Sequence, residues 1–465
     1  MKDVSIGIVG AGAGGLSLAR LLTERGFTRV TVLERSERVG GKSLTVEAGG
    51  TRHELGTCYT MAGYKETTRW MREAGVDGYR LTRHQYRLID GRTVSFKDFA
   101  RGGSALGSVA AVLRYVQHWR RFHAWDLRGS PDDGRDIDGR PFSAVVAEPF
   151  AAWLDARGLD AIARIGLRAV TVAGYGALDE LPTLYGLRWV TPGLLWSGLR
   201  SSMKEPVPSW ESLWTHLARS LDVRAGCAIT AAQRREGQWH LSTSAGDLRF
   251  DHLVVSSPID DLGWLALAPE RIEALGAITW REYTASLVDV ADWFTDAETR
   301  AFQVAAVDRA ARERCHLLVG RRAIDKRDPT RGPIPGTLYM AYQYSRPDLT
   351  DEALTGILRD DLQADGASLR AVLDRRRWRY SPQLSPEAIR SGAVARFERS
   401  QGGDGLWFTG AVAHHESVDN IVTYNQRLVE RIEAALAGGD PGSPGVLEPI
   451  ARRHEWRLGF DLLAS

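Results

Sequence analysis

The chain has 465 residues, a formal net charge of +2 and three cysteines. Its length predicts two or three structural units, and so small a charge requires no polyanionic partner and argues against nucleic-acid binding. Cys58, Cys227 and Cys315 lie too far apart for a disulfide framework or a cysteine-rich zinc site, which favours the cytoplasm. We expect no secretory signal, and no membrane span, because no apolar run reaches about 20 residues.

The N-terminal 43 residues predict a strand, a glycine turn, a helix and a second strand ending in a carboxylate. The apolar run 4–9 precedes Gly10, Gly12 and Gly15, which have the spacing of a dinucleotide-binding turn. Gly10 would allow the tight turn, Gly12 the approach of a pyrophosphate, and Gly15 the close packing of the helix. The N–H groups that begin this helix favour phosphate, and Glu34 can accept hydrogen bonds from a ribose diol.

A second glycine pair, Gly40 and Gly41, follows before Lys42. An enzyme that binds only a nicotinamide cofactor needs nothing particular at this point. The pair instead resembles the segment that flavoproteins of the amine oxidase and phytoene desaturase superfamily lay along FAD. There the backbone passes close to phosphate and ribitol, which favours glycine. We therefore predict non-covalently bound FAD.

Helical periodicity dominates residues 98–207, and strands return from residue 221. A strand near Ile229, a hairpin and a buried strand at 253–258 predict a second nucleotide-domain segment. In the superfamily the backbone at the position of Ile229 holds the adenine edge, although a plain core position fits the sequence equally well. Residues 262–390 read as a sheet with its own helices.

The chain closes with a strand that ends at Gly410, followed by a loop and a helix predicted at 421–436. Asp419 or Asn420 is a natural N-cap for this helix. In the superfamily this helix points its N-terminus at the pyrimidine end of the isoalloxazine, where its dipole favours negative charge. Nucleotide contacts at three distant places favour FAD over NAD.

We predict an α/β fold in which a discontinuous Rossmann-like FAD-binding domain of the GR2 type carries a substrate domain of mixed sheet and a helical cap. The FAD-binding domain takes residues 1–97, 208–261 and 391–438. The mainly helical cap takes 98–207, the substrate-binding domain 262–390, and a linker and C-terminal tail 439–465.

Four segments together resemble the bacterial polyunsaturated fatty acid double-bond isomerases of this superfamily. They are Val39–Ser43 with Arg52–Gly56, Ala173–Gly176 with Leu181–Trp189, Trp378–Pro382, and Trp407–Gly410 continuing through Asp419 and Asn420 to Tyr424. The Gly-Tyr-Gly element at 174–176 is the most specific part. The resemblance extends the FAD contacts to Ala13, Gly14, Arg35, Lys42, Gly56, Thr57, Ala411 and Ile421.

The resemblance implies a redox-neutral reaction in which flavin N5 takes a hydride from a carbon between two double bonds and returns it to another carbon. No side chain is assigned as catalytic. Such a reaction needs a dry, apolar channel with aromatic faces that stabilise a cation. Candidates for this channel are Tyr175, Tyr185, Trp189 and Trp196. The implied substrate is an apolar polyunsaturated acyl or polyene molecule.

Two positions depart from the family pattern. Ala411 stands where many members place Glu, so one expected cofactor contact is missing. His84 aligns with the arginine that fixes the fatty acid carboxylate in these isomerases, and Arg83 or Arg87 would have to replace it. The substrate therefore remains open between a free acid, an acyl group on a carrier protein and a polyene.

The alternative function is an FAD-dependent oxidase or desaturase of an apolar polyene or amine. Amine oxidases commonly hold a lysine near flavin N5, and this chain has none between Lys204 and Lys326. A reductase that uses a pyridine nucleotide is disfavoured because the sequence has no second glycine-rich motif directly after a predicted strand. A flavoprotein without enzymatic activity is the last alternative. His414, His415 and Glu416 read as a loop near the cofactor, and we predict no metal.

Overall fold

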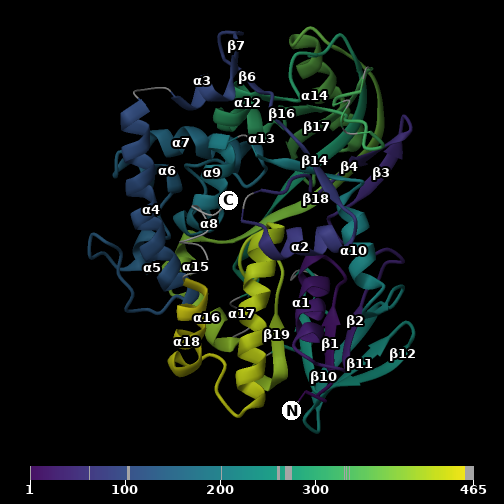
Figure 1. The fold of residues 1–465 in the computed structure, drawn as a ribbon, viewed down its shortest axis with the longest axis vertical. Helices are drawn as coiled ribbons and strands as arrows, with labels where there is room; N and C mark the ends of the chain where they lie inside the picture. The colour runs from purple at the N-terminus through teal and green to yellow at the C-terminus, as the bar shows by residue number, and fades with distance from the viewer. Residues whose placement is uncertain are drawn as a thin grey trace.

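The computed structural model describes residues 2–61, 63–101, 105–200, 202–258, 262–267, 275–328, 330, 332–334 and 336–455. Strands and helices mix throughout, so the α/β class is confirmed. Figure 1 shows the strands β1, β2 and β19 with helices α1 and α17 at one end, a group of helices along one side, and a second sheet at the far end. Within the described residues, no helix is both long and apolar enough to cross a membrane.

A five-stranded parallel sheet forms the Rossmann-like part of the molecule. Its order is β19-β13-β1-β2-β9, with strands at Leu406–Phe408, His252–Val255, Ile6–Val9, Val30–Leu33 and Asp222–Arg224. Apart from the exposed edge strand β9, these are short apolar runs that are largely buried, as parallel strands covered on both faces require. The sheet thus joins three stretches of chain that are far apart in sequence.

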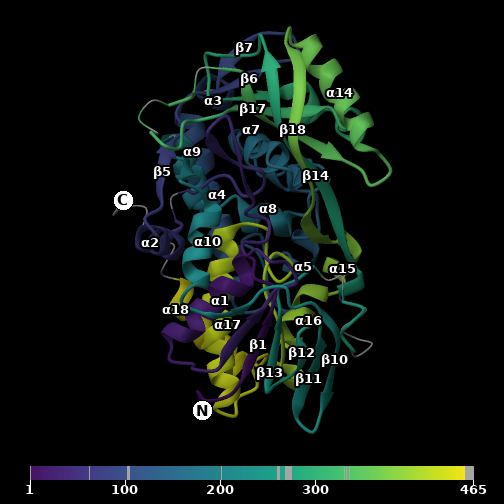
Figure 2. The same cartoon turned by 90° about the vertical axis from the view of Figure 1, so that its right-hand side faces the viewer.

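Helices α1 (Ala13–Glu24) and α17 (Val418–Leu436) lie side by side beside this sheet (Figures 1 and 2). They share one apolar core with α10 (Trp210–Ala218) and α2 (Lys65–Glu73). An antiparallel three-stranded sheet packs next to the five-stranded sheet. It consists of β10 (Ile229–Arg235), β11 (Gln238–Thr243) and β12 (Gly246–Phe250).

Most of the helices between β7 and β8 gather in one helical region. Its helices are α3 (Phe96–Arg101), α4 (Ala105–Leu127), α5 (Phe142–Val145), α6 (Phe150–Asp155), α7 (Asp160–Gly166), the π-helical turn η1 (Leu167–Val172), α8 (Thr183–Trp189) and α9 (Pro192–Arg200). They enclose their own aromatic-rich core.

A seven-stranded mixed sheet forms the far end of the molecule, in the order β18-β14-β17-β16-β15-β6-β7. Its strands are Ser368–Leu384, Ile278–Ala291, Leu338–Ser345, Leu317–Arg322, Thr299–Phe302, His84–Arg87 and Thr93–Ser95. Figure 2 shows the long β14 extending from this sheet toward the middle of the molecule. Helices α12 (Gln303–Val307), α13 (Arg309–Glu313) and α14 (Asp351–Ala364) accompany it.

The other elements are two ribbons and several short helices. The ribbons pair β3 (Thr45–Ala48) with β4 (Thr51–Glu54) and β5 (Asp77–Arg80) with β8 (Lys204–Val207). The helices are α15 (Pro386–Arg390), α16 (Ala393–Ser400), the 3-10 turn η4 (Gly403–Gly405) and α18 (Pro444–Glu455). Strands β6 and β7 fall inside the predicted FAD-binding segment 1–97 but pair in the larger sheet. The division into domains remains a prediction.

Candidate flavin site and aromatic chamber

The glycine turn after β1 fits a dinucleotide. A Cβ on Gly15 would lie 1.9 Å from the carbonyl oxygen of Gly10, and one on Gly14 would lie 2.4 Å from Ser256 Oγ. Helix α1 begins at Ala13, after an N-cap, Gly12, that offers no side-chain acceptor. No acidic residue stands in its first turn, so the N–H groups there are available to an anion.

The second glycine pair lies directly against this turn. A Cβ on Gly41 would lie 3.0 Å from Gly12 Cα, and Gly40 N–H donates to the carbonyl of Ala11 at 2.8 Å. Gly40 and Gly41 both have positive φ angles, which glycine adopts without strain. The predicted contacts Lys42, Gly56 and Thr57 lie together, since Thr57 N–H donates to the carbonyl of Lys42 at 3.2 Å and a Cβ on Gly56 would lie 1.7 Å from the same oxygen.

Glu34 directly follows β2 and lies beside the turn. Its carboxylate accepts from the N–H of Ala11 at 2.8 Å and of Ser36 at 2.9 Å, and retains lone pairs for further donors such as ribose hydroxyls. Its neighbour Arg35 follows the strand on the surface. The N–H of Cys227 donates to the carbonyl of Glu34 at 2.8 Å, which brings the start of β10, and with it Ile229, to the same edge. The side chain of Ile229 packs against the core, so its predicted backbone contact with adenine stays a prediction.

The closing segment completes the same region. Gly410 Cα would lie 3.0 Å from a Cβ on Gly14, so strand β19 delivers its glycine to the start of α1. Ser257 Oγ, next to the Gly10 turn, is buried without a hydrogen-bond partner. A polar ligand bound beside these two converging glycine turns would give this buried hydroxyl a hydrogen-bond partner. The residues present therefore fit FAD.

The start of α17 differs from the prediction in one respect. Its N-cap is Ser417, whose hydroxyl accepts from the N–H of Asn420 at 3.2 Å, so neither Asp419 nor Asn420 caps the helix. The helix starts at Val418 because the serine hydroxyl satisfies its first N–H groups three residues earlier than expected. Asp419 lies in the first turn, and burial raises the pKa of its carboxyl to about 7. Ile421 lies in this first turn, and Ala411 lies in the loop between β19 and α17.

A cluster of aromatic rings, called the aromatic chamber below, lies next to these glycines. It comprises the rings of Tyr175, Tyr185, Trp189, Tyr283, Tyr380 and His415. His415 lies among them, with ring centroids 4.8 Å from Tyr175, 5.5 Å from Trp189 and 6.5 Å from Tyr185. Burial holds the pKa of His415 well below its usual value, so the ring is neutral, and its Nε2 has no hydrogen-bond partner.

The Gly-Tyr-Gly element shapes this chamber. Gly174 and Gly176 have positive φ, and Cβ atoms there would lie 2.8 Å from the Tyr283 ring and 2.6 Å from the Arg281 guanidinium. Between them, Tyr175 donates its hydroxyl to the Glu416 carbonyl at 2.7 Å. The element therefore connects the helical region to the loop before α17.

Lys42 and Glu416 form an ion pair at the boundary between the glycines and the chamber, with the Lys42 ammonium 5.6 Å from the Tyr380 ring centroid. Lys326 is buried elsewhere and bonds Glu54 at 2.8 Å and Glu205 at 3.2 Å. Both lysines are held by carboxylates.

The predicted carboxylate-binding residues occupy different surroundings. Arg83 is 53% exposed and pairs with Glu298 at 3.2 Å, and Arg87 pairs with Asp365 at 3.3 Å. His84 is buried, and its Nδ1 accepts from Arg168 Nη2 at 2.7 Å. Burial and the Arg168 charge hold the pKa of His84 well below its usual value, so it is neutral.

Arg168 was not predicted from the sequence. It lies on η1, the turn whose other residues bind the chamber: Trp189 Nε1 donates to the carbonyl of Ala169, and the Tyr283 hydroxyl donates to that of Val172 at 2.7 Å. No described carboxylate pairs with Arg168, whose guanidinium lies 5.5 Å from the Phe96 ring centroid. Trp196, by contrast, lies on α9 with the Arg200 guanidinium 4.3 Å from its ring centroid, and has no ring contact with the chamber.

His414 and His415 point in different directions. His414 Nε2 donates to Asp126 at 3.0 Å, while His415 faces the chamber. Among the residues that the structure describes, no group of three or more His, Cys, Asp or Glu side chains is arranged to hold a metal ion.

Comparison with known proteins agrees with this geometry. Residues 8–74 match the family model described as an NAD(P)-binding Rossmann-like domain. The polyenoic fatty acid isomerase of Ptilota filicina is 26% identical over 215 residues, which are 41% of this chain and 42% of that protein. A flavin-containing amine oxidase of Oncorhynchus mykiss is 31% identical over 119 residues, 24% of this chain and 22% of the relative. The chain thus matches less than half the length of these curated relatives.

Among solved structures, a CLA-producing fatty acid isomerase from P. acnes aligns with a TM-score of 0.78 at 23% identity, covering 93% of this chain and 99% of that one. At this identity the likeness shows a shared fold. Fold and site together define a protein with a Rossmann-type nucleotide-binding domain that is similar to flavin-containing amine oxidases, and these relatives imply a flavin-type cofactor. The predicted resemblance to polyunsaturated fatty acid isomerases is confirmed.

Proposed function

We propose that this chain is an FAD-dependent double-bond isomerase of a polyunsaturated acyl substrate. The observation that carries the proposal is the aromatic chamber, which adjoins the glycine turns through Lys42 and Glu416. Bound FAD would supply a group that accepts a hydride and returns it, so that double bonds shift without net oxidation. The names of the fatty acid isomerases from Ptilota filicina and P. acnes support the same substrate class.

The residues of the chamber suit a substrate that becomes cationic. The faces of Tyr175, Trp189 and Tyr380 present negative quadrupole to a developing positive charge. The ring of His415 is neutral, so it adds no repulsive charge. At the boundary, the Glu416 carboxylate neutralises the Lys42 ammonium, so this ion pair adds no net charge. Tyr175, Trp189 and His415 are buried, which keeps water from a reactive cation.

Arg168 is our candidate for the group that holds a free carboxylate. Its guanidinium stands beside His84, the position that the family resemblance assigns to this task, and it has no acidic partner among the described residues. Because neutral His84 accepts one N–H and fixes the guanidinium, the remaining donors can bind a carboxylate in a bidentate manner. This favours a free acid over an acyl group on a carrier protein. Arg83 and Arg87 remain less favoured alternatives.

The function is tested by incubating the flavin-loaded protein with non-conjugated polyunsaturated acids under nitrogen. We expect conjugated-diene absorbance to grow over many turnovers without oxygen. Turnover that stops after one equivalent per flavin and resumes only with oxygen would instead establish the oxidase or desaturase. In that reaction the buried, unpartnered Nε2 of His415 is a candidate proton acceptor.

The role of Arg168 is tested separately with the acid and its methyl ester. R168M is expected to raise KM for the acid about 10- to 100-fold, since a hydrogen bond to a charged group contributes about 1.5–3 kcal/mol, and to leave KM for the ester unchanged. R83M is the matched control, because Arg83 is exposed and already paired with Glu298. An R168M enzyme with equal losses on acid and ester would remove the assignment.

A further inference from the structure

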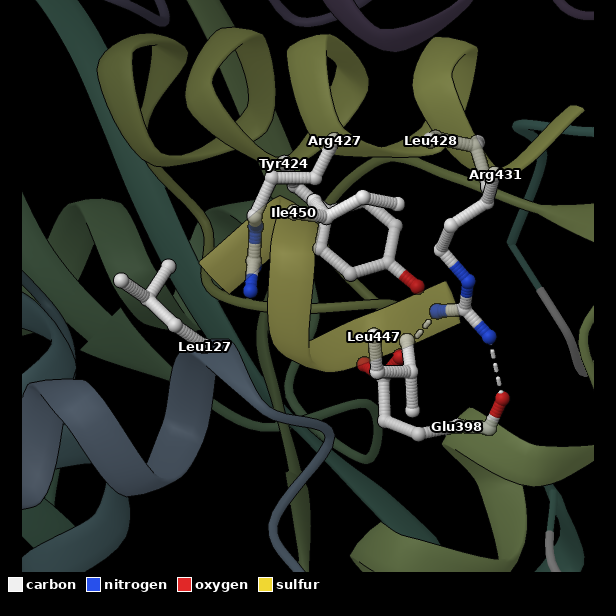
Figure 3. A pocket seen from close by; sticks show the side chains of 8 residues that line it. All are labelled: Leu127, Glu398, Tyr424, Arg427, Leu428, Arg431, Leu447 and Ile450. Carbon is white, nitrogen blue, oxygen red and sulfur yellow. Dashed lines mark hydrogen bonds and ion pairs between the residues drawn. The ribbon is translucent and has the colours of Figure 1, made fainter. Parts of the chain in front are cut away.

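A small cavity lies beside α17, away from the glycine turns and the aromatic chamber. Side chains from α4, α16, α17 and α18 line it: Leu127, Glu398, Tyr424, Arg427, Leu428, Arg431, Leu447 and Ile450. All eight residues are buried. Figure 3 shows Arg427 and Arg431 descending from the same helix on either side of the Tyr424 ring.

The two arginines differ in their partners. Arg431 bonds the Glu398 carboxylate and the carbonyls of Glu398 and Pro441. Arg427 is only 7% exposed, yet it makes no hydrogen bond or ion pair with any described residue, and its Nε is among the buried atoms without a partner. Its guanidinium lies 5.2 Å from the centroid of the Tyr424 ring. A buried charge in this state carries a desolvation cost that no hydrogen bond or ion pair to a described residue offsets.

The neighbouring charges do not compensate it. The Asp126 carboxylate already pairs with Arg188 at 2.7 Å and with His414. The Glu398 carboxylate already pairs with Arg431. Burial lowers the pKa of His123 to about 3 and that of His414 to about 4, so both rings are neutral. The cluster therefore holds three guanidinium groups against two carboxylates, and arginine cannot lose its proton in a protein.

We propose that this cavity binds a small monovalent anion of the halide class as the counterion of Arg427. The guanidinium supplies N–H donors, while Leu127, Leu428, Leu447 and Ile450 form walls that suit a weakly hydrated ion better than phosphate or sulfate. The small cavity fits a single atom rather than a polyatomic acid. Because Leu127 ends α4, the anion would join the helical region to α17 and α18.

The test uses the full chain and bromide. Crystals grown without halide and soaked in sodium bromide should show an anomalous peak at the Arg427 guanidinium, and R427M crystals should lose that peak while keeping those at the surface. A wild-type crystal with surface peaks but none in the cavity would overturn the proposal, leaving at most a water there.

Thermal unfolding gives an independent readout. In bromide rather than gluconate at equal ionic strength, the wild-type midpoint should rise by about 2–5 °C and saturate. The R427M midpoint should move only as far as that of R452M, a control that removes a 74% exposed arginine from α18. Equal shifts in all three proteins would contradict a specific site.

Discussion

The buried pair of Arg188 and Asp126 offers the sharpest test of how the helical region is held to the flavin region. Arg188 of α8 donates to both carboxylate oxygens of Asp126, at 2.7 and 3.1 Å, and to the carbonyl of His414 at 2.9 Å. Asp126 also accepts from Ser130 at 3.2 Å and from His414 at 3.0 Å. Arg188 and His414 hold the pKa of Asp126 well below its usual range, so the group stays ionised.

D126N keeps the shape of the side chain but leaves Arg188 buried without its counter-charge. Removing one partner of such a pair typically costs about 3–5 kcal/mol of unfolding free energy, whereas removing both costs much less. We therefore expect D126N to lose about 3–5 kcal/mol and the double variant D126N/R188M to recover at least half of that loss.

The assay is equilibrium unfolding in urea followed by tryptophan fluorescence, since Trp119 and Trp125 lie on the same helix as Asp126. D132N is the control: Asp132 is exposed and pairs with Arg399 at 3.5 Å, so its loss should be within about 1 kcal/mol. A D126N loss below about 1 kcal/mol, or a double variant whose loss equals the sum of the two single losses, would refute this reasoning.

Three further outcomes are expected. G15A should weaken flavin binding at least tenfold in a fluorescence titration, because its Cβ would meet the carbonyl of Gly10 at 1.9 Å, while G356A, with open space around it, should bind normally. The raised pKa of Asp419, about 7, means that the folded apo-protein loses stability as pH rises from about 4 to about 7, since the unfolded chain ionises first. D419N should therefore raise the midpoint of thermal unfolding more at pH 8 than at pH 5, and an equal gain at both would contradict the shift. Y175L should slow turnover by about tenfold or more and Y175F by less, because only leucine removes the aromatic face; equal losses would assign Tyr175 to its hydroxyl bond instead.

Local sequence was a sufficient guide to the glycine turns. Gly10, Gly12 and Gly15 act within one strand-turn-helix unit, so their spacing alone predicts their geometry. Family resemblance, in turn, indicated Tyr175 and Trp189, which the structure brings into one chamber. Whether they line a substrate channel remains a prediction.

Contacts between distant elements could not be predicted in the same way. Arg168 reaches His84 only because a π-helical turn and a sheet strand meet, and neither segment carries a local signal of that meeting. Trp196 follows Trp189 closely in sequence, but α8 ends at Trp189 and a new helix starts at Pro192, which carries Trp196 elsewhere. The predicted N-cap of α17, Asp419 or Asn420, was wrong because Ser417 can cap the helix equally well. The residue types alone do not decide which of the three does so.

The discontinuous five-stranded sheet has a consequence for how the protein is made. Strand β1 leaves the ribosome before the other strands of this sheet, whereas its neighbour β13 begins at His252 and the edge strand β19 begins at Leu406. At roughly 5–20 residues per second, the last strand emerges about 20–80 s after the first. During that interval the apolar face of β1 has no complete sheet to join. A nascent chain halted before residue 406 should therefore be prone to aggregate and unable to retain flavin.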